Sequence, residues 1–378
     1  MHGLSMQSVS AIEALPAEAW NALVGDAYPF LRHEFLHALE ASGAVCGRSG
    51  WEPCHLALWW GDALVGVMPC YHKYHSFGEY VFDWAWADAW ERAGGHYYPK
   101  ALTAIPFTPA PGPRLALAAG IDPVEARELL ASAWEDRELS SWHLLFAEDE
   151  EVDAWRAARP SLLERHSVQF QWRDAGYGDF DGFLAVLTSK RRKEIRRERR
   201  IVADQGIRLR RLVGRDIDRE ALMHFYRCYQ ITYLERGRQG YLNLEFFERL
   251  LATMSDALVL VQACLGERPV AAALCLQGRD TLFGRYWGSE VEADCLHFEA
   301  CYYQGIEHCL AHGLTCFDPG TQGEHKLVRG FAPRRLRSLH HIADPHLHDA
   351  VARFCDKEQR YVAAYHERVI QALPFKRA

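Results

Sequence analysis

The sequence lacks any long apolar run. No stretch approaches the roughly 20 apolar residues that a helix needs to cross a bilayer, and residues 1–10 form no apolar signal core. The chain has eleven cysteines, an odd number, and none of them falls in a Cys-x-x-Cys pair. A disulfide framework or a zinc ribbon would show different spacing. We therefore predict a soluble, unexported protein in a reducing cytoplasm.

An excess of positive charge and the common catalytic motifs are also missing. With 43 basic and 50 acidic side chains the net charge is −7, so any nucleic-acid binding requires a local basic patch. There is no Gly-x-Ser-x-Gly, Walker or Gly-x-Gly-x-x-Gly motif, the commonest signals of hydrolases, NTPases and dehydrogenases. His308 and His312 have a spacing that can bind zinc, but no third ligand is evident, and we expect no metal site.

The length of 378 residues predicts two domains, with the boundary in the polar stretch near residues 160–180. We place the domains at residues 1–165 and 166–378. Both halves contain two apolar runs separated by a Gly-Asp or Gly-Glu turn, which is a hairpin signal. In the second half an aromatic strand (281–287), a helix (298–312) and a strand (314–317) follow.

In the first half, residues 80–84 are the expected counterpart of the aromatic strand. A repeated order of elements is the mark of a duplicated unit. We expect an α/β fold with a mixed sheet and helices on its faces. The five prolines of segment 99–114 predict a loop there, and Asp122-Pro123 predicts the start of a long helix.

The sharpest local feature is a basic helix predicted over residues 188–200. Eight basic residues lie between Lys190 and Arg200, against only Glu194 and Glu198. Paired guanidinium contacts suit phosphate oxygens, so we expect this helix to hold the phosphates of RNA, a nucleotide-linked sugar or a coenzyme. The alternative is a solvated charged face with the two glutamates as local partners. The candidate phosphate-binding residues are Lys190, Arg192, Lys193, Arg196, Arg197 and Arg200.

The densest chemistry lies in three segments of the second half: residues 285–288, 297–304 and 318–326. The glycines and the proline of 318–323 predict a turn that presents Glu324, His325 and Lys326 after a strand. Loops at strand ends are where ligands bind in open mixed sheets.

Four segments, residues 80–94, 189–200, 297–304 and 322–331, resemble signatures of the FemAB-like family, a branch of the Gcn5-related acetyltransferase (GNAT) superfamily, and the similarity covers roughly residues 20–375. The resemblance implies two tandem GNAT-like domains and transfer of an acyl or aminoacyl group to an amine. In the better understood Fem transferases the donor is an aminoacyl-tRNA, and a lysine in a Phe-Lys-x-x-Phe-like motif stabilises the reaction centre. Lys326 resembles that lysine, although His325 replaces the usual Phe and the spacing to Phe331 is longer.

We expect Lys326 to face the carbonyl oxygen on which negative charge develops, and Glu324, Glu299 or His297 to accept the proton of the amine. Each also has a structural alternative: Lys326 could pair with Glu324, Glu299 could be an ordinary salt-bridge residue, and His297 could pack or cap. The remaining candidate substrate-binding residues are Arg285, Tyr286, Tyr303, His325 and Arg329 in the second domain and Asp83, Trp84, Trp86 and Tyr97 in the first.

No tightly bound cofactor is expected, and aminoacyl-tRNA is the expected co-substrate. The Arg/Gln-x-x-Gly-x-Gly/Ala pattern typical of acetyl-coenzyme A binding occurs in neither half. Two alternatives stay open: an acyltransferase that uses acetyl-coenzyme A or an acyl carrier protein, and a non-catalytic module that binds RNA or a cell-wall precursor.

Overall fold

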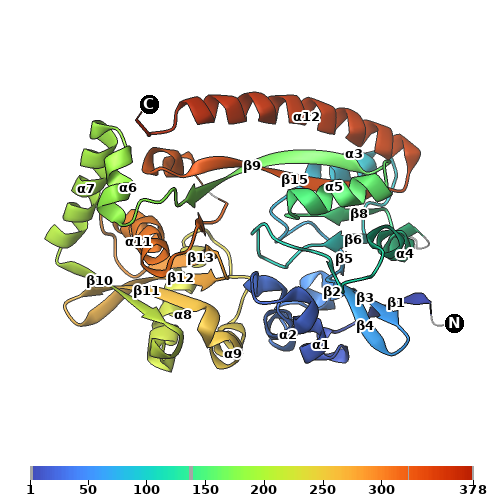
Figure 1. The fold of residues 1–378 in the computed structure, drawn as a ribbon, viewed down its shortest axis with the longest axis horizontal. Helices are drawn as coiled ribbons and strands as arrows, with labels where there is room; N and C mark the ends of the chain where they lie inside the picture. Colours follow the sequence, from blue (N-terminus) through green and yellow to red (C-terminus); the bar gives the residue numbers. More distant parts are fainter. Residues whose placement is uncertain (1–2, 136–138, 322, 377–378) are drawn as a thin grey trace. The chain divides into compact units, whose positions relative to one another are not determined.

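The chain folds into two compact units (Figure 1). The computed structural model describes residues 3–135, 139–321 and 323–376. Unit 1 comprises Met1–Ser167 and Arg335–Ala364, and unit 2 comprises Val168–Arg334 and Tyr365–Ala378. The first boundary lies close to the expected one. The sequence-based division placed residues 335–364 in the second domain, but they belong to unit 1. The reason is that strand β15 (Ala332–Ile342) pairs with strand β8 (Ser141–Leu144), which is almost 200 residues away in the sequence, and no local pattern reveals such a pairing.

Unit 1 contains a mixed sheet and a smaller antiparallel sheet. The mixed sheet has the order β9-β15-β8-β6-β5-β2; β6 and β8 run parallel, and the pairs β15-β8, β6-β5 and β5-β2 are antiparallel. The smaller sheet has the order β1-β3-β4-β7. The strands are β1 (Leu4–Val9), β2 (Trp51–Pro53), β3 (His55–Trp60), β4 (Ala63–Met68), β5 (Tyr71–Lys73), β6 (Lys100–Thr103), β7 (Ala116–Leu117), β8 (Ser141–Leu144), β9 (Leu163–Arg173) and β15 (Ala332–Ile342).

Unit 2 contains one mixed sheet of the order β10-β11-β12-β13-β14-β9, to which β9 contributes its second half. Neighbouring strands are antiparallel except for β13 and β14, which are parallel. The other strands of this unit are β10 (Ile207–Val213), β11 (Leu258–Leu265), β12 (Arg268–Gln277), β13 (Thr281–Ser289) and β14 (Cys316–Asp318). The mixed-sheet α/β architecture predicted from the sequence is thus confirmed.

Helices connect these strands in both units. Those of unit 1 are α1 (Ala17–Val24), α2 (His33–Ala41), α3 (Trp84–Arg92), α4 (Pro123–Glu135) and α5 (Asp149–Ala158). Those of unit 2 are α6 (Phe180–Val186), α7 (Ser189–Asp204), α8 (Arg219–Leu234), α9 (Leu244–Met254), α10 (Leu296–Phe298), the π-helical turn η6 (Glu299–Tyr303), α11 (Gln304–His312) and the 3-10 helix η7 (Glu324–Arg329). The long C-terminal helix α12 (Pro345–Gln371) has residues in both units.

The two units repeat one strand arrangement, but not with the expected members. In unit 1 the parallel pair β6 and β8 is connected through α4, as the parallel pair β13 and β14 is connected through α10 to α11 in unit 2. The counterpart of the aromatic strand β13 is therefore β6, whereas the sequence indicated residues 80–84. Residues 84–92 form helix α3, because alanine at alternate positions favours a helix more than the tryptophans favour a strand.

Strand β6 lies within the proline-rich segment 99–114, where the sequence predicted only a loop. The four residues Lys100–Thr103 contain no proline and are all buried. Later in the segment the fully buried Arg114 donates hydrogen bonds to the carbonyl oxygens of Ala110, Gly112 and Leu145. These bonds satisfy backbone groups that an irregular buried loop cannot pair within itself.

Several local predictions are confirmed. Helix α4 begins after Asp122, whose Oδ1 accepts hydrogen bonds from the backbone N–H groups of Val124 and Glu125. Both hairpins form, as β3 with β4 and as β11 with β12. Among the described residues, no helix is both long and apolar enough to cross a membrane.

Candidate functional site

Helix α7 of unit 2 contains the basic cluster and docks by Ile195 and Val202, which are both buried. The cluster is partly compensated. The Arg191 guanidinium pairs with Glu194 at 2.6 Å, and Arg196 pairs with Asp181 of α6 at 2.8 Å. The first pair is half-buried and the second lies largely in solvent, where an ion pair contributes little.

The other cations of α7 form a line that we call the basic stripe: Lys190, Lys193, Arg197 and Arg200. All four are exposed, and their spacing of three and four residues places them along one side of the helix. The half-buried Arg192 lies beside them. Within residues 3–135, 139–321 and 323–376 none of these five side chains has an ion-pair partner. The stripe is the part of α7 available to an external polyanion.

Arg199 points in the opposite sense, into the unit, and binds Glu299. Its Nε and Nη2 lie 3.0 and 3.1 Å from the two oxygens of Glu299, and its Nη1 lies 2.6 Å from Glu307. The Gln304 amide donates a further hydrogen bond of 2.8 Å to Glu299. The Glu299 carboxylate is 4% exposed and held by three donors, so this geometry favours the salt-bridge interpretation of Glu299 over that of a proton acceptor.

Glu198 connects α7 with η7. Its carboxylate accepts hydrogen bonds from Arg329 Nη2 at 2.6 Å and from the Tyr303 hydroxyl. The buried Arg329 also donates to the His325 carbonyl oxygen at 2.7 Å, and its guanidinium carbon lies 3.5 Å from the centroid of the Phe298 ring. Arg329 and Tyr303 are therefore brought together, but as parts of an internal network that fixes the turn before η7.

Glycines at three positions shape the turn around Lys326. Gly320, Gly323 and Gly330 have φ values of 87°, 92° and 87°, which side chains with a Cβ rarely adopt. The resulting bends bury Lys326, whose Nζ donates a hydrogen bond to the Gly320 carbonyl oxygen at 2.5 Å. Burial lowers the pKa of Lys326 to about 8, against the opposing attraction of Asp318. Near pH 7 the side chain is thus a buried ammonium ion, not the surface partner of Glu324.

Two histidines lie beside this turn. The His325 Nε2 is 2.7 Å from the Tyr302 hydroxyl of the π-helical turn, and the centroids of the His297 and His325 rings are 6.1 Å apart. Burial and the neighbouring His325, Lys326 and Arg329 lower the pKa of His297 to about 4. His297 is consequently neutral near pH 7, with one ring nitrogen that carries no proton. π-Helical turns are frequent at functional sites.

The other candidates of unit 2 make none of the hydrogen bonds described above, although Arg285 is near enough to Lys326 for its charge to lower the pKa of the lysine. Glu324 is exposed and accepts a hydrogen bond of 2.8 Å from the Tyr365 hydroxyl. Tyr286 is buried against Phe225 and Phe247, with ring centroids 6.3 and 5.4 Å away, and belongs to the core. Arg285, its neighbour on β13, is half-buried, and its guanidinium carbon lies 5.8 Å from the centroid of the Tyr286 ring.

Unit 1 contains a second, buried charged cluster that includes two predicted residues. The Lys100 ammonium lies 2.5 Å from Asp83 and 2.8 Å from Glu79, and the Tyr97 hydroxyl donates to Asp83 at 2.7 Å. All four side chains are buried. One ammonium cannot neutralise two carboxylates: Asp83, despite its burial, has its pKa held far below the usual range by Lys100, whereas burial raises the pKa of Glu79 to about 7.

The predicted tryptophans separate. Trp84 is 45% exposed and stacks on Phe82 with a centroid distance of 4.3 Å, next to the exposed Phe77. Trp86 is buried, 4.9 Å from the His340 ring. Sequence reasoning missed Lys100 and Glu79. Lys100 lies in the segment read as a loop, and no signal marked either residue.

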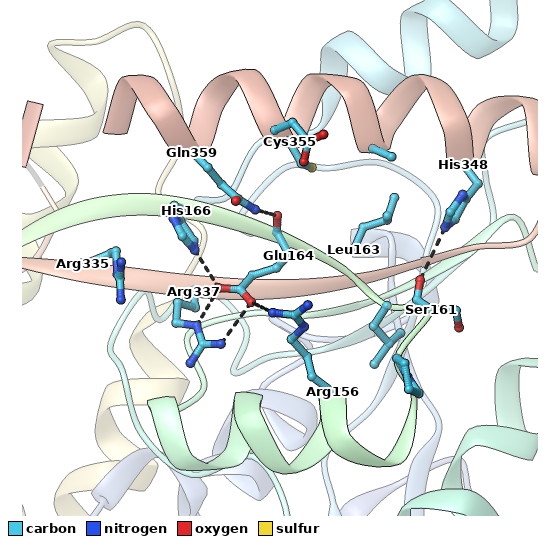
Figure 2. Close-up of a pocket in the computed structure, with 14 residues that line it drawn as sticks. Arg156, Ser161, Leu163, Glu164, His166, Arg335, Arg337, His348, Cys355 and Gln359 are labelled. Carbon is cyan, nitrogen blue, oxygen red and sulfur yellow. Dashed lines mark hydrogen bonds and ion pairs between the residues drawn. The ribbon is translucent and has the colours of Figure 1, made fainter. Parts of the chain in front are cut away.

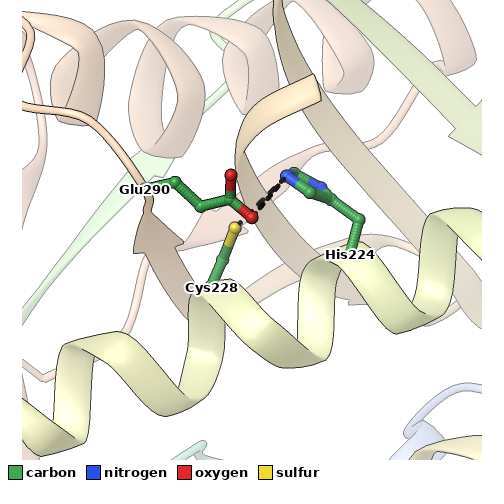
Figure 3. Close-up of side chains that lie close together, drawn as sticks. All are labelled: His224, Cys228 and Glu290. Carbon is green, nitrogen blue, oxygen red and sulfur yellow. Dashed lines mark hydrogen bonds and ion pairs between the residues drawn. The ribbon is translucent and has the colours of Figure 1, made fainter. Parts of the chain in front are cut away.

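A possible metal cluster in unit 2 consists of His224 and Cys228 on α8 and Glu290 after β13 (Figure 3). The His224 Nε2 lies 3.5 Å from Cys228 Sγ and 3.8 Å from Glu290 Oε1. Two arginines, Arg268 at 3.1 Å and Arg227 at 3.6 Å, already balance the charge of Glu290. A divalent cation would add charge to a neighbourhood that is already positive, so we assign no metal to it.

Comparisons with known proteins place the chain in a family. The FemAB-like family, described as peptidoglycan biosynthesis/recognition, matches residues 11–377. A search of curated proteins found no match.

Several solved structures share the fold. FemX has a TM-score of 0.52 and 12% identity, over 89% of this chain and 98% of its own. L-PGS from Bacillus licheniformis has a TM-score of 0.51 and 11% identity, over 87% and 98%. The C-terminal domain of a putative lysylphosphatidylglycerol synthetase from Agrobacterium fabrum has a TM-score of 0.54 and 8% identity, over 90% and 95%. The fold expected from the resemblance to Fem transferases is confirmed.

Proposed function

Because the chain belongs to the FemAB-like family, we propose that it transfers an acyl or aminoacyl group to an amine, with an aminoacyl-tRNA as donor. The observation that carries this proposal is the buried Lys326 ammonium at a glycine-shaped turn, next to the neutral His297. A cation held in a site of low dielectric stabilises an oxyanion much more than it would in water.

The reaction requires little more from the protein. The amine nitrogen attacks the carbonyl carbon of the donor ester, and the developing negative charge on the carbonyl oxygen faces Lys326. His297 accepts the proton that the amine loses and returns it to the ribose oxygen when the ester C–O bond breaks. An amide and a free tRNA hydroxyl result, with no covalent enzyme intermediate.

The basic stripe supports a large phosphate-rich donor. Its four exposed cations rise along α7 by about 4.5, 6 and 4.5 Å per step, which suits successive phosphates of one RNA strand. The segment before α10, where a coenzyme diphosphate would meet a helix N-terminus, instead contains Glu290, Glu292 and Asp294. Glu290 is balanced by Arg268 and Arg227, but Glu292 and Asp294 have no ion-pair partner among the described residues and repel a diphosphate, which favours tRNA over acetyl-coenzyme A.

Unit 1 is proposed to bind the acceptor. The exposed rings of Phe77, Phe82 and Trp84 form one patch above a loop that is tied down by Asp83. Amphipathic aromatic patches of this kind are typical of ligand surfaces. The buried Trp86 supports the patch without being part of it.

The test is equilibrium binding of bulk charged tRNA at several salt concentrations, beside acetyl-coenzyme A. If all four residues of the basic stripe contact phosphates, the slope of log K against log salt is roughly −3 to −4. Arg197→Glu should reduce the size of this slope by about 1 or more. Arg353→Glu, the same change at an exposed arginine of α12, should leave it unaltered. Binding of acetyl-coenzyme A without affinity for tRNA would contradict the tRNA donor and leave an ordinary acyltransferase.

A further inference from the structure

Unit 1 contains a cavity of about 650 Å³ that involves none of the residues proposed for transfer (Figure 2). Three elements enclose it. Helix α12 contributes one face, with residues 348, 352, 355, 356 and 359. Strand β9 contributes the alternate residues 164 and 166, and strand β15 contributes the alternate residues 335 and 337. Arg156 of α5 and residues 160–163 complete the wall. The volume is within the range of small-molecule sites.

One wall of the cavity is cationic. Glu164 accepts hydrogen bonds from Arg337 at 2.7 and 3.0 Å, from Arg156 at 2.7 Å and from His166 at 2.6 Å. Arg337 and His166 together hold the pKa of this carboxyl far below its usual range. The charge of Glu164 is therefore compensated within the wall by Arg156 and Arg337, of which Arg337 also pairs with Asp153 at 2.8 Å, and Arg335 is left without a counter-charge there.

Two guanidinium groups retain donors for a ligand. Arg335 is exposed and has no ion-pair or hydrogen-bond partner among the residues that the structure describes. Arg156 uses only Nη1, and its Nε and Nη2 have no partner within the same ranges. Figure 2 shows the two groups on different elements, β15 and α5, with Arg337 between them. Such an arrangement suits an anion with oxygens in several directions.

The opposite wall is mixed, because α12 also contributes His348, Asp356 and Gln359 to it. Leu162 and Cys355 are buried, and Leu163 and Ala352 are half-buried beside them. Burial raises the pKa of the Cys355 thiol to about 12, so it adds no negative charge. An occupant that satisfies both walls has one charged end and one apolar part.

We propose that this cavity binds a small phosphorylated organic molecule, its phosphate against the cationic wall, where Arg335 and Arg156 have free donors, and its apolar part against Leu162, Leu163 and Ala352. A phosphate fits better than a carboxylate, because its three terminal oxygens offer more acceptors to guanidinium donors and its second negative charge strengthens the attraction to the arginines, while Asp356 at the cavity repels either anion. The site is independent of the proposed transfer and would make unit 1 a receptor for a second small molecule.

The test uses phenyl phosphate, inorganic phosphate and benzoate as probes in isothermal titration calorimetry with the full chain. We expect phenyl phosphate to bind with a stoichiometry of one, and benzoate, which has the same ring, to bind at least roughly tenfold more weakly. Arg335→Gln should weaken phenyl phosphate binding roughly tenfold or more. Arg353→Gln removes an exposed arginine of α12 outside the cavity and should leave the affinity unchanged.

Three results would overturn the proposal: no saturable binding of phenyl phosphate, benzoate binding as tightly as phenyl phosphate, or equal losses in the two variants. Arg335 is exposed and unpaired, so its replacement should not change the thermal unfolding temperature. Inorganic phosphate binding alone, with no gain from the phenyl ring, would contradict the apolar part of the site. None of these outcomes depends on tRNA binding or on transfer.

Discussion

The ion pair between Arg199 and Glu299 offers a sharp test of how unit 2 is held together. We consider Arg199→Met, which keeps the length of the side chain and removes its charge. The change leaves the Glu299 carboxylate buried with only the Gln304 amide as donor, and it removes one of the two arginines beside Glu307. A buried charge without its counter-ion is the costly case.

The magnitude follows from burial. Breaking a buried ion pair costs about 3–5 kcal/mol when one charge is left uncompensated. The Glu299 side chain is 5% exposed but that of Arg199 is 28% exposed, so water screens part of the interaction. With the Gln304 hydrogen bond retained, we expect the free energy of unfolding to fall by about 2–3 kcal/mol.

Arg196→Met is the matched control. It removes the same group from the same helix, three residues away, and breaks an ion pair of similar length, 2.8 Å, with Asp181. The two side chains of that pair are 54% and 78% exposed, and such pairs contribute at most about 1 kcal/mol. The two variants therefore differ in burial and not in chemistry.

The assay is urea denaturation followed by circular dichroism, with the midpoint compared at constant slope. The double variant Arg199→Met/Glu299→Gln should recover much of the loss, because no buried charge then remains. Equal losses for Arg199→Met and Arg196→Met, or a double variant no more stable than Arg199→Met, would refute the reasoning. Glu299→Gln should also retain transfer, since Glu299 is held by cations in our account.

Three further predictions concern titratable groups. Burial raises the pKa of Glu79 to about 7, so between pH 4.5 and 7 the unfolded chain releases this proton while the folded chain keeps it. The free energy of unfolding should therefore fall by up to about 3 kcal/mol as the pH rises through this window. Unfolding of Glu79→Gln, measured over the same pH range, should lack that component. The pKa of Lys326 is about 8, and its charged form is the active one, so the turnover should decline as pH rises through about 8; a rate unchanged up to pH 10 would exclude this role. His297→Gln should lower turnover by about 10²–10⁴-fold with an unchanged unfolding temperature, and activity near that of the parent would assign the proton to another group.

Local patterns predicted the elements well because the signals that form them are local. The basic helix is an example: its apolar positions Ile195 and Val202 repeat at helical spacing and are the residues by which α7 docks. The same spacing places Arg199, four residues after Ile195 and three before Val202, on the docking face, but it could not show which charge Arg199 meets, because Glu299 is 100 residues away in sequence. Periodicity describes which face a residue occupies and not which charge it meets.

The errors arose where neighbouring signals competed. Prolines at both ends of the segment 99–114 concealed strand β6, and with it the buried Lys100. The aromatic residues before α3 favoured a strand over the alanine-rich helix that forms. The candidate turn was predictable because its glycines are marked in the sequence, whereas the exposure of Glu324 and the burial of Lys326 depend on how the turn packs.

The central claim is tested most directly by transfer itself. tRNA charged with labelled amino acids, and separately labelled acetyl-coenzyme A, would be incubated with the protein and a fraction of cellular amines and peptides, and base-stable amide product would be counted. The account predicts label in an amide from tRNA, and a loss of about 10²-fold or more in Lys326→Ala protein whose folded state is verified by circular dichroism. Amide formed from acetyl-coenzyme A alone, or equal transfer by Lys326→Ala, would contradict it.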